Sequence, residues 1–179
     1  MNTITVKKII LLSTIFTLSV ILMIQVVIGG KDSSRIIIAS SPVDSIVVTK
    51  ADTSVVVLQK TGDVWTVGSQ ESTSEWKLAE QSAISPLIEA AGRVKILGTV
   101  SAGGNDEKFG FEEASPVTVV VKSGGKILHS LSLGKTASAS SQSYLRLDNS
   151  REVLLVSGNY RGLFDVTVES LQVKEESKE

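Results

Sequence analysis

Few side chains in this sequence could take part in acid–base chemistry. His129 is the single histidine, and there is no cysteine. The ordinary pKa of histidine lies near neutral pH, so His129 is the first candidate for a general base. It falls in an apolar run whose alternation places it on one face with Ile127, Leu131 and Leu133. We expect a half-buried structural histidine, and the base of a hydrolase is the alternative.

A second group of reactive side chains is acidic and flanks the segment 109–111. Its carboxylates are Asp106, Glu107, Glu112 and Glu113. Two carboxylates about 5–10 Å apart can act as a glycosidase pair, and carboxylates also bind calcium. These adjacent pairs lack the alternating spacing of a calcium loop, so we favour a solvated loop balanced by Lys108 and expect no metal site.

Patterns for phosphate binding and serine catalysis are missing. Gly134-Lys135-Thr136 has the ending of a phosphate-binding loop, but His129 occupies the position where that pattern needs a glycine. No Gly-x-Ser-x-Gly segment is present to expose a nucleophilic serine. The formal net charge of −1 and the lack of a basic stripe do not suit nucleic acid. We therefore expect no nucleotide, no nucleic acid and no cofactor as partners.

The apolar run near the N-terminus restricts the molecule most. Residues 9–28 carry no charge and follow Lys7 and Lys8. About 20 helical residues cross the roughly 30 Å hydrocarbon core of a bilayer. The run is longer than the apolar part of a signal peptide and ends in large residues, where a peptidase needs small ones. We predict an uncleaved transmembrane helix that contacts the lipid bilayer, with a cleaved signal as the alternative.

The flanking charges predict the orientation of this helix. Two lysines precede the run, whereas Lys31 after it is followed at once by Asp32. The positive-inside rule then keeps residues 1–8 in the cytoplasm. Residues 29–42 are expected to form a short linker and a first strand. The rest of the chain would lie outside the cytoplasm, attached to the cell membrane by a single pass.

Beyond the linker, β-branched runs separated by turn residues predict an antiparallel sheet. The predicted strands are 35–39, 45–49, 54–60, 64–67, 95–100, 117–122, 126–133, 144–147 and 152–156. Helical spacing over 78–94 predicts the main helix, which Pro86 starts or kinks and Gly92 ends. A short second helix is expected at 159–164. This order indicates an α+β fold in which helices cover one face of the sheet.

Five short motifs follow one another through these predicted strands and loops. They are Trp65-Thr66-Val67, Lys108-Phe109-Gly110-Phe111 before Pro116, Leu131-Ser132-Leu133-Gly134-Lys135, Tyr144-Leu145-Arg146 and Val153-Leu154-Leu155-Val156. In this order they resemble the DUF4340 domain family over about residues 43–171. The charged tail 172–179 is expected to fray. The resemblance implies a membrane-anchored domain without assigned activity or catalytic residues, and some members look like auxiliary components of ABC-type transport or gliding-motility-like systems.

Tyr144 and Arg146 share one face of a predicted strand. Tyrosine and arginine dominate the energetics of many interfaces, so this pair is the best candidate for a binding patch if the face is exposed. Alternatively, Arg146 pairs with a nearby carboxylate and Tyr144 covers the sheet. We expect a non-enzymatic binding or assembly module beside a membrane-protein partner. The alternatives are an envelope-acting hydrolase that uses His129 with an acidic loop residue, and a small-ligand receptor with a sizeable apolar pocket.

Overall fold

The computed structural model divides into two compact units, Met1–Ser33 and Ser34–Glu179. It describes residues 11–23, 34–50, 52, 54–70, 76–112, 117–139 and 141–174. In the first unit, residues 11–23 are helical. No helix within these described ranges combines the length and the apolar character that crossing a membrane requires. The ends of the predicted transmembrane helix, residues 9–10 and 24–28, lie outside the described residues, as does the end of the charged tail from residue 175.

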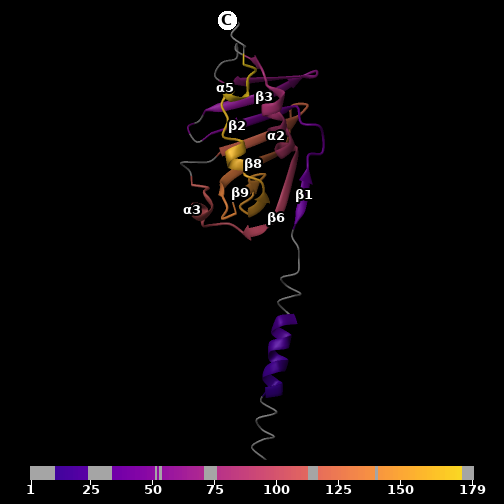
Figure 1. The fold of residues 1–179 in the computed structure, drawn as a ribbon, viewed down its shortest axis with the longest axis vertical. Coiled ribbons are helices and arrows are strands. Elements are labelled where there is room, and N and C mark those ends of the chain that lie inside the picture. The colour runs from indigo at the N-terminus through magenta and orange to yellow at the C-terminus, as the bar shows by residue number, and fades with distance from the viewer. Residues whose placement is uncertain are drawn as a thin grey trace, which may run out of the picture. The chain divides into compact units, whose positions relative to one another are not determined.

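In the described part of the second unit, ten antiparallel strands form one sheet in the order β1-β6-β10-β9-β8-β7-β2-β3-β4-β5 (Figure 1). The strands are β1 (Arg35–Ile38), β2 (Ser45–Thr49), β3 (Val55–Thr61), β4 (Val64–Ser69), β5 (Lys77–Leu78), β6 (Arg93–Ser101), β7 (Val117–Ser123), β8 (Lys126–Thr136), β9 (Gln142–Leu147) and β10 (Val153–Ser157). The order places two meanders side by side, because β7 pairs with β2. Each predicted strand is present, with ends that shift by a few residues.

Four helices accompany the described sheet. They are α2 (Gln81–Gly92), α3 (Asp106–Phe109), α4 (Tyr160–Leu163) and α5 (Val168–Leu171). The main helix ends at Gly92 as predicted, but it is shorter than 78–94, and Pro86 lies inside it rather than at its start. Leu78 and Val94 belong to strands instead, because their backbones pair with β4 and β1. The short second helix is confirmed, and Asn159 caps it by accepting a hydrogen bond from the Gly162 N–H.

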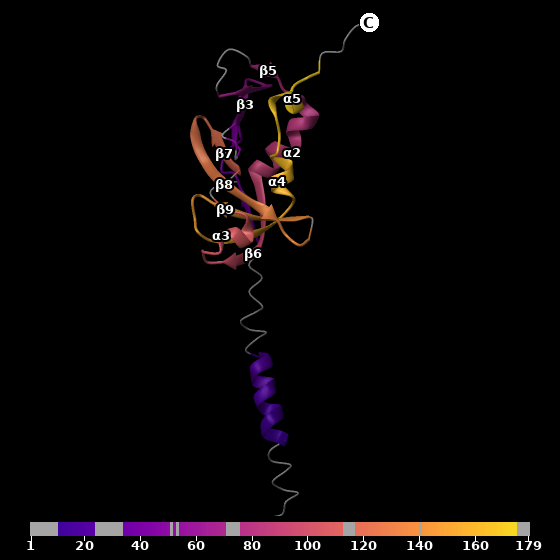
Figure 2. The ribbon, with the colours of Figure 1, turned by 90° about the vertical axis from the view of Figure 1, so that its left-hand side faces the viewer.

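The hydrophobic core lies between one face of the sheet and the helices α2, α4 and α5 (Figure 2). Opposite residues on neighbouring strands supply the sheet side, as in the pair Ile46 and Val121 and the pair Leu133 and Leu145. The helical side includes the fully buried Phe164. Trp65 of the first motif is buried in the same core. These contacts confirm an α+β fold with helices over one face of the sheet. None of α2, α4 and α5 covers the opposite face, here called the outer face.

Candidate functional site

His129 lies on the buried face of β8. It is only 5% exposed, and its Nε2–H donates a hydrogen bond of 2.7 Å to the main-chain carbonyl of Ala91. A β-bulge shifts the pairing so that Ile127, opposite Lys122, is 63% exposed. The expectation that Ile127 shares the face of His129 is therefore wrong, because the extra residue of a bulge reverses the alternation. A sealed histidine bonded to main chain has the surroundings of a structural residue and does not favour the hydrolase.

The same end of α2 receives a second donor. The hydroxyl of Tyr160 lies 3.4 Å from the carbonyl oxygens of Ala90 and Arg93. Burial raises the pKa of Tyr160 to about 12, so the hydroxyl keeps its proton and can donate it. Carbonyl groups at the C-terminal end of a helix have no partners within the helix. His129 and Tyr160 therefore tie β8 and α4 to the end of α2, which is an architectural role.

Tyr144 and Arg146 lie on the outer face, where the segment 106–111, here called the strap, crosses them. Arg146 holds Asp106 through two hydrogen bonds, Nη1 to Oδ2 at 3.2 Å and Nη2 to Oδ1 at 2.6 Å. Its guanidinium carbon lies 4.4 Å from the ring centroid of Phe111. Tyr144 meets Phe109 edge to face, with centroids 4.9 Å apart. Arg146 thus pairs with a carboxylate and Tyr144 covers the sheet, and only 16% of the Arg146 side chain remains exposed.

The acidic residues of this region are not gathered around a shared ligand. The hydrogen bonds from Arg146 hold the pKa of Asp106 below its usual range. Glu107 and Glu112 are exposed, and Glu113 lies outside the described residues. Within the part of the chain that the structure describes, no group of three or more acidic or histidine side chains could hold a metal ion. Of these acidic residues, Asp106 fastens the strap to the sheet through Arg146.

Two glycines allow the strap to touch the sheet. A Cβ on Gly134 would overlap the carbonyl oxygen of Phe109 and lie 2.9 Å from Cζ of Phe111. Gly110 has a φ of +77°, and a Cβ there would lie 2.8 Å from the backbone nitrogen of Lys135. Gly134 and Lys135 are part of the long strand β8, so the segment does not form a phosphate loop. The motifs around residues 110 and 134 therefore make one packing contact.

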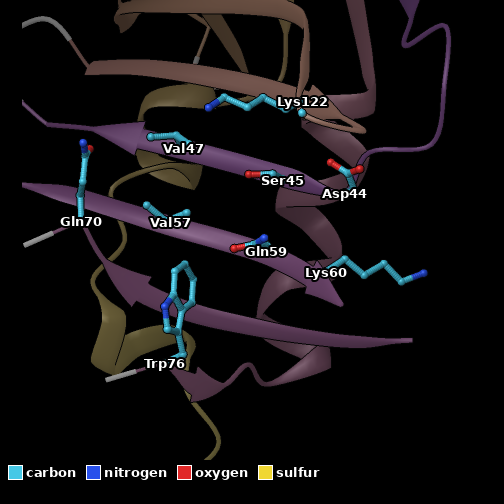
Figure 3. A pocket seen from close by; sticks show the side chains of 10 residues that line it. Asp44, Ser45, Val47, Val57, Gln59, Lys60, Gln70, Trp76 and Lys122 are labelled. Carbon is cyan, nitrogen blue, oxygen red and sulfur yellow. The ribbon is translucent and has the colours of Figure 1, made fainter. Parts of the chain in front are cut away.

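Over β2 and β3 the outer face carries an open concavity of about 450 Å³, here called the hollow. Its lining residues are Asp44, Ser45, Val47, Val57, Gln59, Lys60, Gln70, Trp76, Lys122 and Gly125. Figure 3 shows Val47 and Val57 on neighbouring strands, with Trp76 on one side and Lys122 on the other. The hollow lies on the same face as the strap, but over the other meander of the sheet. It is the strongest candidate for a binding site.

The Trp76 ring packs closely against Gly68 of β4. A Cβ on Gly68 would lie 3.1, 3.2 and 3.4 Å from three adjacent atoms of the six-membered ring. Three nearly equal distances mean that the ring lies face-on over the glycine. Trp76 as a residue nevertheless remains 40% exposed. We missed this residue in the sequence, where the available signal was a tryptophan in a polar stretch outside any apolar alternation.

The polar lining of the hollow differs from a hydrolytic site. Gln59 and Gln70 carry amides, which both donate and accept hydrogen bonds. Asp44 is the one carboxylate among the described lining residues, and its Oδ2 accepts a hydrogen bond from the Gly124 N–H. A glycosidase needs two carboxylates on opposite sides of its substrate. An aromatic surface with amides and a lysine can bind a ligand by stacking and hydrogen bonding.

Comparison with known families matches residues 78–177 to a domain of unknown function, DUF4340. No curated protein and no solved structure matches the chain. The matched segment contains the strap and both glycines that seat it, but not β2, β3 and β4, on which most of the hollow is built. The match confirms the resemblance over residues 78–177, more than half of the chain, and leaves the Trp65-Thr66-Val67 motif outside the matched segment. This chain belongs to the DUF4340 family.

Proposed function

We propose that this chain is a membrane-anchored, non-enzymatic binding module that holds a partner in the hollow of its outer face. The uncharged run 9–28 supports a transmembrane helix, and the described helix 11–23 falls within that run. The two lysines before the run support a cytoplasmic N-terminus and a domain on the opposite side of the membrane. In this arrangement the domain faces the cell envelope.

The exposed Trp76 ring is the observation that carries the binding function. Tryptophan is enriched among the residues that contribute most to binding at interfaces, and a partly exposed ring beside polar groups can pack on a partner. Here one face of the ring already packs on Gly68, which reduces the conformational freedom that a partner must remove when it packs on the other face. The described lining contains one carboxylate and no histidine, which favours binding over hydrolysis.

The length of the linker supports a partner close to the membrane. Residues 29–34 separate the apolar run from β1. At about 3.3–3.6 Å per extended residue, they can span roughly 20 Å. The domain would therefore meet membrane proteins, such as the ABC-type transporters that the family resemblance implies, or envelope material next to the bilayer.

Photo-crosslinking from the hollow tests this proposal. A photoreactive phenylalanine analogue replaces Lys60 at the exposed rim of the hollow, and in a matched control it replaces the exposed Glu89 on α2. In native membranes, the full chain should form adducts from position 60 and not from position 89, and Trp76→Ala should reduce them. Equal adducts from both positions, or none from position 60, would contradict binding at the hollow.

A further inference from the structure

We infer that the hollow beside Trp76 binds an acidic glycan, meaning a chain of sugar rings that carry carboxylates. This inference rests on the proposed binding function and names the chemistry of the partner. Three features of the hollow carry it: an exposed aromatic face, neutral groups that both donate and accept hydrogen bonds, and a cationic rim.

The aromatic face matches the apolar side of a sugar ring. A pyranose presents C–H groups on one face, and packing them against an aromatic ring removes apolar surface from water. Trp76 lies face-on over Gly68 and is 40% exposed, so its ring is already positioned for such packing. Val47 and Val57 extend the apolar floor beside it (Figure 3). A repeating sugar chain can therefore cover both the ring and the valines.

The amides match the hydroxyl edge of the same ring. Each sugar hydroxyl both donates and accepts a hydrogen bond, and neighbouring hydroxyls form pairs. Gln59 and Gln70 offer an amide oxygen and an NH₂ group each, and Ser45 adds a hydroxyl. Figure 3 shows Gln59 beside Trp76, so hydroxyls can reach an amide while the ring stacks.

The charges on the rim favour an acidic sugar over a neutral one. Among the described residues Lys122 takes part in no ion pair. Lys60 is only loosely paired with Asp63, at 3.9 Å, and both side chains are exposed. The carboxylate of Asp44 is already engaged by Gly124. A carboxylate on the ligand would thus gain charge-assisted hydrogen bonds from lysine without displacing a strong partner.

The position of the hollow within the sheet disfavours an extended peptide. Peptides that bind sheets usually add a strand to a free edge through main-chain hydrogen bonds. The floor strand β2 is paired on both sides, with β3 and β7, and β3 is paired with β2 and β4. Recognition at the hollow must therefore use side chains, which suits a glycan.

Binding of defined sugars to the full chain in detergent micelles tests the inference. The acidic probes are a hexamer of β-1,4-linked mannuronate, a galacturonate hexamer and a hyaluronan hexamer. The neutral control is β-1,4-mannohexaose, which differs from the mannuronate hexamer by lacking carboxylates. We expect at least one acidic hexamer to bind, and mannuronate to bind more tightly than mannohexaose. Trp76→Ala should weaken acidic binding about tenfold or more. Lys122→Met should remove the preference for the acid while retaining the apolar stem.

Two further variants keep the result interpretable. Val100→Ala, at a position of similar exposure (42%) on β6, should leave binding unchanged. Gln59→Leu provides a second loss of binding that does not depend on the folding of the Trp76 variant, and circular dichroism checks both. Binding by none of the acidic hexamers, or equal binding of a hexaglutamate peptide, would overturn the inference. If crosslinking from position 60 still yields a partner, the proposed function stands without the glycan; if it also fails, both fall.

Discussion

At the scale of single residues, the missing side chain of Gly134 controls how closely the strap approaches the sheet. A methyl group there would overlap the Phe109 carbonyl oxygen and crowd the Phe111 ring. Phe109 and Phe111 are both buried and have little room to move away. Gly134→Ala should therefore reduce the free energy of unfolding by about 2–3 kcal/mol. Urea denaturation followed by circular dichroism measures this change.

Gly98 provides the matched control for that substitution. It also lies in a strand, β6, but a Cβ there would meet nothing within 4 Å, and its φ is ordinary. Gly98→Ala should therefore change the unfolding free energy by no more than about 0.5 kcal/mol. Similar losses at the two positions would mean that the close approach at Gly134 is not what makes glycine necessary.

The residue types of the outer face could be predicted from the sequence, but their partners could not. The alternation of the sequence predicts that Tyr144 and Arg146 share one face of a strand, and in the structure both lie on the outer face of β9. The carboxylate that pairs with Arg146 comes from Asp106, in a stretch without periodicity and 40 residues away. Likewise, alternation predicts that Ile127 and His129 share one face of the strand, but a bulge in the pairing of β8 with β7 places them on opposite faces. Local pattern carries no information on either long-range contact.

At the scale of elements, the strap should respond to acid through the ion pair between Asp106 and Arg146. The pKa of Asp106 is lowered by the hydrogen bonds from Arg146 in the folded state. Its pairing therefore stabilises the fold above the usual pKa range of aspartate, near 4, and that stabilisation is lost as pH falls through the lowered value. Asp106→Asn should lower the urea midpoint at pH 7, and the difference from the parent protein should shrink below about pH 4.

Glu107 serves as the control for this titration. It is the exposed neighbour of Asp106 in α3, and it forms no ion pair among the described residues. Glu107→Gln should leave the urea midpoint at pH 7 unchanged. A difference between the Asp106 variant and the parent protein that stayed constant down to pH 3 would show that the ion pair does not fasten the strap.

The main helix should become more stable when its proline is removed. Pro86 lies inside α2 and has no N–H to donate to the carbonyl of Ser82, four residues earlier. Its side chain is exposed, so the substitution removes little packing. Pro86→Ala should raise the unfolding free energy by about 1–2 kcal/mol, less whatever entropy the proline removes from the unfolded chain. Glu89→Ala, on the same helix, should have little effect. A Pro86→Ala variant no more stable than the parent protein would contradict the idea that the proline costs α2 a hydrogen bond.

The strands were predictable because their β-branched runs alternate between turns, whereas the ends of α2 were not. The helical spacing extends from Leu78 to Val94, but Leu78 pairs with β4 and Val94 pairs with β1, so both residues belong to the sheet. Those pairings join segments that are distant in the sequence, so they cannot be read from a local period. The short strand β5 and the single-turn helices α3 and α5 escape the prediction because they contain too few residues to show a period.

At the scale of the whole molecule, one charge in the apolar run should disturb the proposed anchor. Leu18 lies near the middle of residues 9–28. An arginine at the centre of a membrane helix costs about 2.5–3.5 kcal/mol on insertion scales. Leu18→Arg should therefore increase the fraction of protein that alkaline carbonate extracts from membranes, whereas Leu18→Ala should not. Full extraction of the parent chain would contradict the anchor.

The folding unit should be larger than the segment that matches the family. Residues 78–177 include β7 but not β2, which pairs with it, and they lack the buried Ile46, Leu58 and Trp65. This fragment would leave one edge of its sheet unpaired and its apolar face incompletely covered. It should give a collapsed NMR spectrum and no cooperative urea transition, while residues 34–179 should give both dispersed signals and a single transition. Cooperative folding of the shorter fragment would make the first meander, and with it the hollow, an addition to an autonomous family core.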